Sequence, residues 1–153
     1  MSPSWPGARI MAAVELDAAG RQDAATAAEV ARWLKTSLLL VHVVDAPRAP
    51  IWLMPDRSAR DRIRVSQAER QLERLAATTG ASVSAETRVV SGDPAHELAA
   101  VAAAEQVGLL VTGLRDRRRW FGMRRGTLSY HVLTRAVAPV LACPPRWRPR
   151  NSV

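Results

Sequence analysis

The segment from Val111 to Leu128 reads VTGLRDRRRWFGMRRGTL and concentrates the residues that could do chemistry. Gly113 ends an apolar run, and Gly126-Thr127 begins a segment with helical spacing. A glycine after a strand lets backbone N–H groups approach a ligand, and a helix N-terminus presents unpaired N–H groups with a partial positive charge. Together with the hydroxyl of Thr127, these features predict a phosphate-binding site.

The arginines of this segment add to that prediction. Six of them lie between Arg115 and Arg125, with Asp116 as the only acid, so the segment carries a charge of +5. The tail 146–153 adds +3, so these two segments account for the whole net charge of +8. Guanidinium groups bind phosphate in a fork geometry. The alternative interpretation is that the glycines only turn the chain and cap a helix, while the arginines form a solvated loop.

Other reactive side chains show no catalytic or metal-binding pattern. His42 lies within an apolar run, which favours a packed histidine, and no His, Asp or Glu spacing is typical of a metal site. Cys143 is the only cysteine, so an intrachain disulfide and a cysteine-built metal site are excluded. Because Cys143 has no recognisable base partner, we interpret it as a buried structural thiol.

Apolar runs alternate with segments of helical periodicity along the chain, which predicts strands and helices in alternation. The predicted strands are 9–15, 37–44, 83–90, 108–112 and 138–143, and the predicted helices are 21–35, 58–79, 94–106 and 127–136. We expect loops at 16–20 and at 45–57, because the second contains three prolines. Asp93 and Pro94 are typical of a helix start.

This order predicts an α/β fold: a single doubly wound domain with a five-stranded parallel sheet and helices on both faces. We expect an N-terminal extension at 1–8, the domain at 9–145 and a basic tail at 146–153, since 153 residues leave no room for a second domain. Ligands of such folds bind beyond the carboxyl ends of the strands, where the strand order reverses.

Composition and charge exclude several classes of function. No apolar run approaches the roughly 18 to 20 residues of a membrane span, so we expect no membrane partner. The N-terminus lacks the pattern of a signal peptide, which indicates a cytoplasmic protein. Trp120 and Phe121 beside the arginines could stack on nucleic-acid bases, but an aromatic pair that anchors the loop is the favoured interpretation. Nucleic acid therefore ranks last among the partners considered.

The glycine segment resembles that of the universal stress protein family. The family pattern is G-x2-G-x9-G-[ST], followed by a helix and a strand with PVL; here Gly113, Asp116, Gly126-Thr127 and 139–141 occur in that order and spacing. Two further segments are similar to the family: AAVE at 12–15, where the family usually has VAVD, and LLLVHVVD at 38–45. The resemblance covers roughly residues 9 to 145 and implies the family's fold and a cytoplasmic homodimer.

The resemblance also implies an adenine nucleotide site that binds ATP, with or without Mg²⁺. It places Glu15 near the ribose or base, with Ala13 two residues before it, and gives Val43 a backbone contact to adenine. The phosphates are assigned to the glycine segment. The residues that the resemblance assigns to ligand binding are Ala13, Glu15, Val43, Gly113, Arg115, Gly126, Thr127 and Leu128.

Asp116 departs from the family pattern, because it replaces a glycine. A carboxylate repels phosphate oxygens, by roughly 4 kcal/mol for unit charges about 4 Å apart at an effective dielectric near 20. Two functions therefore stay open: a dimeric, nucleotide-binding sensor or adaptor of the stress response, and a dimeric interaction module whose arginine loop contacts acidic proteins. The resemblance places the dimer contact at the strand Val137–Cys143. We expect no enzymatic activity beyond, at most, slow ATP hydrolysis.

Overall fold

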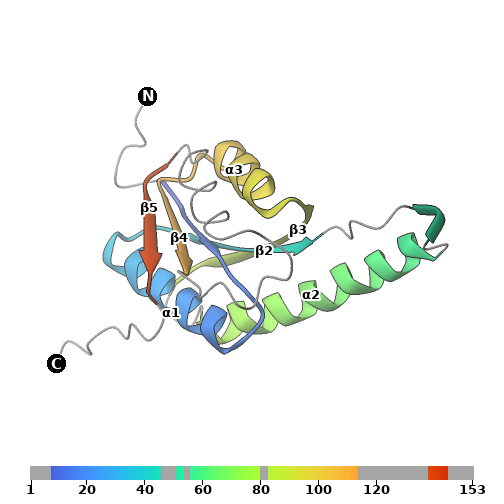
Figure 1. Ribbon diagram of the computed structural model, residues 1–153. Coiled ribbons are helices and arrows are strands. Elements are labelled where there is room, and N and C mark those ends of the chain that lie inside the picture. The colour runs from blue at the N-terminus through green and yellow to red at the C-terminus, as the bar shows by residue number, and fades with distance from the viewer. Residues whose placement is uncertain (1–7, 46–50, 54–55, 80–82, 114–137, 145–153) are drawn as a thin grey trace.

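Five strands form one parallel sheet within the described residues of the computed structural model, which are 8–45, 51–53, 56–79, 83–113 and 138–144 (Figure 1). The sheet order is β3-β2-β1-β4-β5, and every neighbouring pair is parallel. The five-stranded parallel sheet predicted from the sequence is thus confirmed, although β3 begins at residue 85 rather than 83. The strands are β1 (Ile10–Ala13), β2 (Leu38–Asp45), β3 (Ala85–Gly92), β4 (Leu109–Gly113) and β5 (Val140–Cys143).

Helices cover both faces of this sheet, as predicted for a doubly wound domain. Helices α1 (Ala18–Trp33) and α2 (Arg57–Thr79) pack on one face, and α3 (Pro94–Ala104) packs on the other (Figure 1). Side chains of a strand point to alternate faces, so Ile10 and Ala12 join the core under α1 and α2, while Met11 joins the core under α3. Burial on both faces explains why the central strands are largely apolar rather than alternating.

Helix α1 begins three residues earlier than its predicted start at residue 21, because Asp17 caps it. The Asp17 carboxylate accepts a hydrogen bond from the backbone N–H of Gly20 at 2.8 Å. The predicted loop at 16–20 is therefore wrong from Ala18 onward. The predicted cap of α3 is confirmed: Asp93 accepts a hydrogen bond from the His96 N–H at 3.0 Å, and Pro94 occupies the first turn.

Both α1 and α3 end in the same hydrogen-bonded turn, built on a residue with positive φ. Lys35 has a φ of 53° and Gln106 a φ of 50°. After α1, the N–H of Thr36 donates to the carbonyl of Ala31 at 3.0 Å; after α3, the N–H of Val107 donates to that of Ala102 at 3.0 Å. This Schellman arrangement satisfies carbonyls that a helix end leaves unpaired.

Helix α2 packs on the sheet with only part of its length. Its buried residues are Ala68, Leu72 and Leu75, all in the second half of the helix. The first half extends beyond the sheet together with the short 3-10 helix η1 (Ile51–Leu53) (Figure 1). η1 is the described part of the proline-rich stretch that the sequence predicts to be a loop.

A cluster of ion pairs joins β1, β3 and α3 on the side of the sheet where the strands begin. Arg9 lies 2.9 Å from Glu86 and 2.7 Å from Glu105, and Arg88 lies 2.5 Å from Glu105. Burial alone would lower the pKa of Arg9, but its hydrogen bonds to the two glutamates raise it. Hydrogen bonds from Arg88 and then Arg9 lower the pKa of Glu105. The ion pairs thus favour the charged forms of Arg9 and Glu105.

Several predicted features lie outside the described residues: the helix at 127–136, the glycine segment beyond Gly113, and the tail at 146–153. Among the helices that the structure does describe, none combines the length and the apolar character that a membrane span requires.

Candidate functional site

In this fold, a ligand site is expected at the carboxyl ends of β1 and β4. The chain runs from β1 through β2 to β3 in one direction across the sheet, and β4 and β5 lie on the other side of β1. The strand order therefore reverses between β1 and β4. In doubly wound folds, ligands bind outside the carboxyl ends of the strands at such a reversal.

Three of the predicted ligand residues lie on adjacent strands at this edge. Ala13 ends β1 and is in register with Val41 on β2 and Thr112 on β4. Val43 follows Val41 by two residues, and Gly113 follows Thr112 directly. Ala13 and Val43 are both half-buried and pack against the core under α3. The structure thus brings Ala13, Val43 and Gly113 to one edge of the sheet.

Glu15, the predicted ribose or base ligand, is half-buried and lies two residues beyond the end of β1. The backbone of Glu15 is in close contact with Gly20 of α1. A Cβ at Gly20 would lie 2.6 Å from the carbonyl carbon of Glu15, so only glycine fits at that position of α1. Nδ1 of His42 lies 2.8 Å from the carbonyl oxygen of Val14, which agrees with the interpretation of His42 as a packed histidine.

Gly113 lies against α1, where the carboxylate of Asp23 occupies the space of a side chain. A Cβ at Gly113 would lie 3.1 Å from Cγ of Asp23 and closer still to one of its oxygens. Gly113 is also in register with Cys143 on β5. Glycine is therefore favoured here for close packing between the helix and the strand, a structural reason that is independent of any ligand.

Asp23 is a residue that the sequence analysis missed. Its exposed fraction is only 7%, and it is one of two buried polar or charged residues in the described part of the chain. Burial raises the pKa of the Cys143 thiol, and the negative charge of Asp23 raises it further. Cys143 is therefore a buried, protonated thiol, as interpreted from the sequence.

A signal for Asp23 does exist in the sequence. The buried positions of α1 form a stripe with spacings of three and four residues, and Asp23 lies within it. The predicted helix 21–35 already includes Asp23, and following this spacing back from Ala27 places the acid on the inner face of the helix. The buried residues of this stripe are Gly20, Asp23, Ala24, Ala27, Ala28 and Ala31.

The other predicted ligand residues lie outside the described part of the chain. These are Arg115, Gly126, Thr127 and Leu128, together with Asp116, which replaces a family glycine. Within the described residues, no group of three or more His, Cys, Asp or Glu side chains is arranged to hold a metal ion.

A shallow groove of about 530 Å³ lies elsewhere, between the C-terminal half of α2 and the start of β3. Small apolar side chains and two glutamates, Glu73 and Glu86, line it. Because the groove is at the beginning of β3, it is separate from the edge where Ala13, Val43 and Gly113 meet.

Comparison with known proteins identifies a family and a set of similar folds. The model of the universal stress protein family matches residues 8–144. No curated protein is significantly similar to the chain in sequence. The universal stress protein UspA from Lactobacillus plantarum superposes with a TM-score of 0.69 at 20% identity, over 89% of this chain and 97% of that one.

Two similar structures were determined with adenine nucleotides. The universal stress protein from Archaeoglobus fulgidus in complex with dAMP has a TM-score of 0.63 at 18% identity, over 88% of this chain and 96% of that one. A universal stress protein in complex with cAMP has a TM-score of 0.61 at 20% identity, over 90% and 96%. At these identities the likeness establishes a shared fold.

Proposed function

Because this chain belongs to the universal stress protein family, we propose that it binds ATP or a related adenine nucleotide as a cytoplasmic, dimeric sensor or adaptor of the stress response. The observation that carries the proposal is the meeting of Ala13, Val43 and Gly113 where the strand order reverses. Structures of the same fold with dAMP and cAMP support it.

The described residues fit the base and ribose of such a nucleotide. Val43 would contact the base through its backbone, and Ala13 lies on the neighbouring strand. Glu15 follows on the same chain segment, where its carboxylate would accept hydrogen bonds from ribose hydroxyls. Gly113 begins the segment that would hold the phosphates, together with Gly126, Thr127, the amide of Leu128 and the guanidinium of Arg115.

Calorimetric titration with ATP and Mg²⁺ tests the proposal. We expect saturable heat, and we expect Glu15→Ala to weaken binding by roughly tenfold, the value of a hydrogen bond to a charged group. Glu69→Ala is the matched control, because Glu69 is an exposed acid on α2, away from this edge. Absence of both heat and a thermal shift at millimolar nucleotide would exclude nucleotide binding.

Asp116→Gly extends the same titration to the residue that departs from the family. If position 116 faces the phosphates, removing its carboxylate tightens ATP binding, because one repulsive charge is lost. An unchanged affinity shows that the side chain points away from the ligand.

The alternative function is a dimeric interaction module that binds acidic proteins through its arginine loop and does not bind nucleotide. Both functions share the dimer, in which the strand Val137–Cys143 pairs with its copy. In support, β5 is an edge strand of the described sheet, and its Leu141 is 38% exposed. Light scattering during the ATP experiment would report a dimer in either case, so the heat alone separates the two functions.

A further inference from the structure

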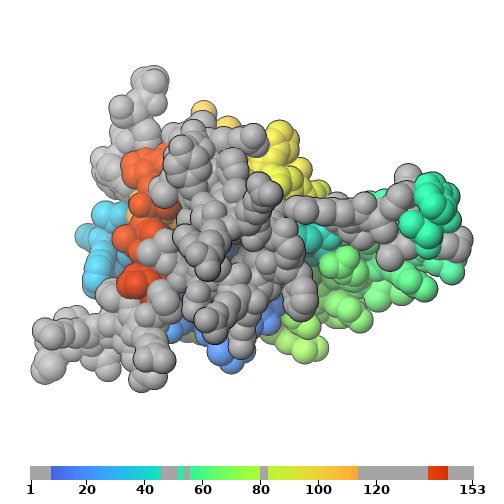
Figure 2. Space-filling model, viewed as in Figure 1, coloured from blue at the N-terminus to red at the C-terminus, as the bar shows by residue number. Residues whose placement is uncertain are grey.

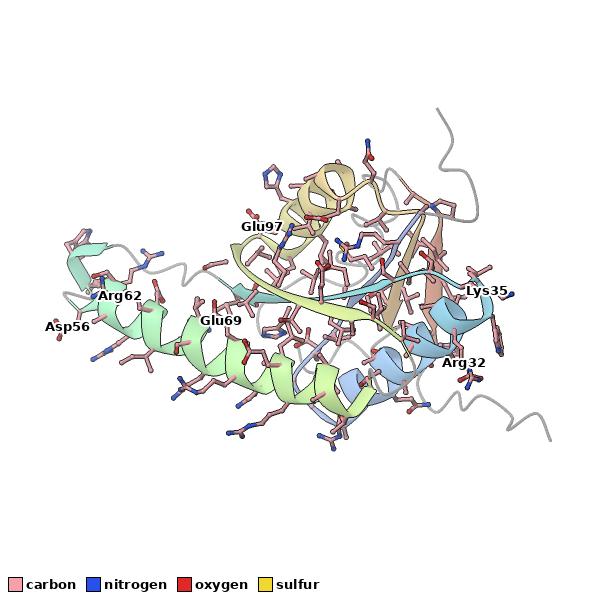
Figure 3. The ribbon with its side chains drawn as sticks, turned by 180° about the vertical axis from the view of Figure 1, so that it is seen from behind. Arg32, Lys35, Asp56, Arg62, Glu69 and Glu97 are labelled. Atoms are coloured by element: carbon pink, nitrogen blue, oxygen red, sulfur yellow. The ribbon has the colours of Figure 1, made fainter. Side chains whose placement is uncertain are left out.

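The first half of α2 and the 3-10 helix η1 form a projection, which we call the arm and define as residues 51–53 and 57–67. None of the side chains described in the arm is buried, and the buried residues of α2 begin at Ala68. In Figure 3, Asp56 and Arg62 lie at the end of α2 that is away from the sheet, whereas Glu69 lies nearer the body. Arg64 donates a hydrogen bond to the carbonyl of Asp45 at the end of β2, at 3.5 Å, so the arm touches the domain body there. The side chains nearer the end of the arm project away from the sheet.

Large apolar side chains gather on this arm. Trp52 is 80% exposed, Leu53 58% and Ile63 57%. Only two other large apolar residues in the described part of the chain are exposed, Trp33 and Leu141, and both lie on other elements. Exposed apolar side chains that gather on one projection are typical of a contact site.

The charges around these apolar residues are mostly positive. From Asp56 to Arg64 there are four arginines and two aspartates. Asp61 is shared by Arg57 at 3.7 Å and Arg64 at 3.9 Å. Arg60 and Arg62 are exposed, and no carboxylate in the described residues pairs with either of them. Two guanidinium groups are thus available beside the apolar side chains.

We propose that the arm docks on an anionic lipid surface, with Trp52, Leu53 and Ile63 between the headgroups and with Arg60 and Arg62 on lipid phosphates. Tryptophan and aliphatic side chains next to arginine are the composition of interfacial membrane contacts. Positively charged segments gain attraction to anionic lipid with each basic residue. A second copy of the arm is a poorer occupant, because the two positive charges would repel each other.

The geometry also favours a flat partner. The space-filling view shows the arm extending from one side of the molecule, so the domain body does not obstruct its approach to an extended surface (Figure 2). The expectation of no membrane partner rested on the lack of a spanning segment, which a peripheral contact does not require. The proposal does not rest on nucleotide binding, since none of the predicted ligand residues lies in the arm.

Sedimentation with vesicles tests the proposal. We expect the full chain to bind vesicles that contain phosphatidylglycerol and phosphatidylcholine in roughly equal parts, and not vesicles of phosphatidylcholine alone. The double variant Trp52→Ser/Ile63→Ser and the double variant Arg60→Ser/Arg62→Ser should each reduce vesicle affinity by about tenfold or more. These positions are exposed, so the variants should fold normally, which circular dichroism checks.

Matched controls separate the arm from the other basic segments of the chain. Trp33→Ser removes an exposed tryptophan of α1, and Arg74→Ser removes an exposed arginine of α2 outside the arm. Both should bind vesicles like the parent. If the arm variants also bind like the parent, the arginine loop or the tail carries the contact and the proposal is wrong. It is equally wrong if anionic vesicles are not bound, or if the arm variants change only the oligomeric mass.

Discussion

Asp23 and Gly113 form a matched pair across the interface between α1 and β4. The glycine provides the space, and the carboxylate of Asp23 fills it at the edge where the ligand site is expected. Gly113 therefore has two separate reasons to be glycine: packing against Asp23, which the geometry establishes, and contact with phosphates, which belongs to the proposed function. A variant that separates these reasons is informative.

We predict that Gly113→Ala lowers the free energy of unfolding by about 1–3 kcal/mol, because the new methyl group overlaps the Asp23 carboxylate. Urea denaturation measures the change. In an Asp23→Ala background, the space of the Asp23 carboxylate is empty, so Gly113→Ala should lower the free energy of unfolding by less. The coupling free energy between the two substitutions should be on the order of 1 kcal/mol. Asp23→Asn preserves the side-chain volume, so in that background Gly113→Ala should lower the free energy of unfolding by the full amount. An equal cost in all three backgrounds would contradict this account.

The sequence allowed part of this site to be predicted at the level of single residues. Ala13, Val43 and Gly113 each stand at or near the end of an apolar run, and parallel strands bring such ends to one edge. Asp23 was missed because charged residues are expected on the outer face of a helix, and only the buried spacing of its neighbours reveals otherwise. Gly20 was taken for a loop residue because its role, close contact with the Glu15 backbone, depends on tertiary packing.

At the scale of elements, the start of α3 has a clear sequence signal, whereas the turns that end α1 and α3 do not. Asp93-Pro94 is a recognisable start, whereas the two Schellman turns use lysine and glutamine in place of the usual glycine. A positive φ costs a residue with a side chain roughly 1–2 kcal/mol, so these turns persist because packing and hydrogen bonds stabilise them. The predicted helices 21–35 and 94–106 end at these two residues, but the residue types do not indicate the positive φ.

We predict that Gln106→Gly raises the free energy of unfolding by about 0.5–1 kcal/mol, because glycine adopts the positive φ without steric cost and loses only part of the gain through entropy. Lys35→Gly should behave alike. Ala104→Gly, within the last turn of α3, should have the opposite sign, by about 1 kcal/mol. Thermal unfolding of the three variants measures these changes; a lower melting temperature for Gln106→Gly would refute the prediction.

At the scale of the whole molecule, the ion pairs and the described ligand residues lie at opposite ends of the strands. The ion pairs of Arg9, Arg88, Glu86 and Glu105 tie the beginnings of β1 and β3 to the end of α3. Ala13, Val43 and Gly113 lie where the strands end. The parallel arrangement, which the sequence predicted, produces this division.

We predict that acidification weakens the ion pairs of Glu105 with Arg9 and Arg88. Because the pKa of Glu105 is lowered in the folded state, its contribution is present above the unfolded pKa, near 4.3, and is lost as the pH falls through the lower folded value. Glu105→Gln should lower stability at neutral pH and should reduce the loss on acidification. Denaturation at a series of pH values checks this. Glu69→Gln, whose exposed side chain has no ion pair in the described residues, should leave the profile unchanged.

Helix α2 also has a mechanical consequence. It is one uninterrupted helix of 23 residues, roughly 35 Å long, with its second half fixed on the sheet and its first half free. A stiff rod held at one end acts as a lever, so a load applied near Trp52 becomes a torque on Ala68, Leu72 and Leu75. The neighbouring strand, β3, is at the edge of the sheet and is paired on one side only, by β2. A pull on the free end of α2 would therefore be transmitted first to the outermost strand of the described sheet, while β1, β2 and β4 are flanked on both sides.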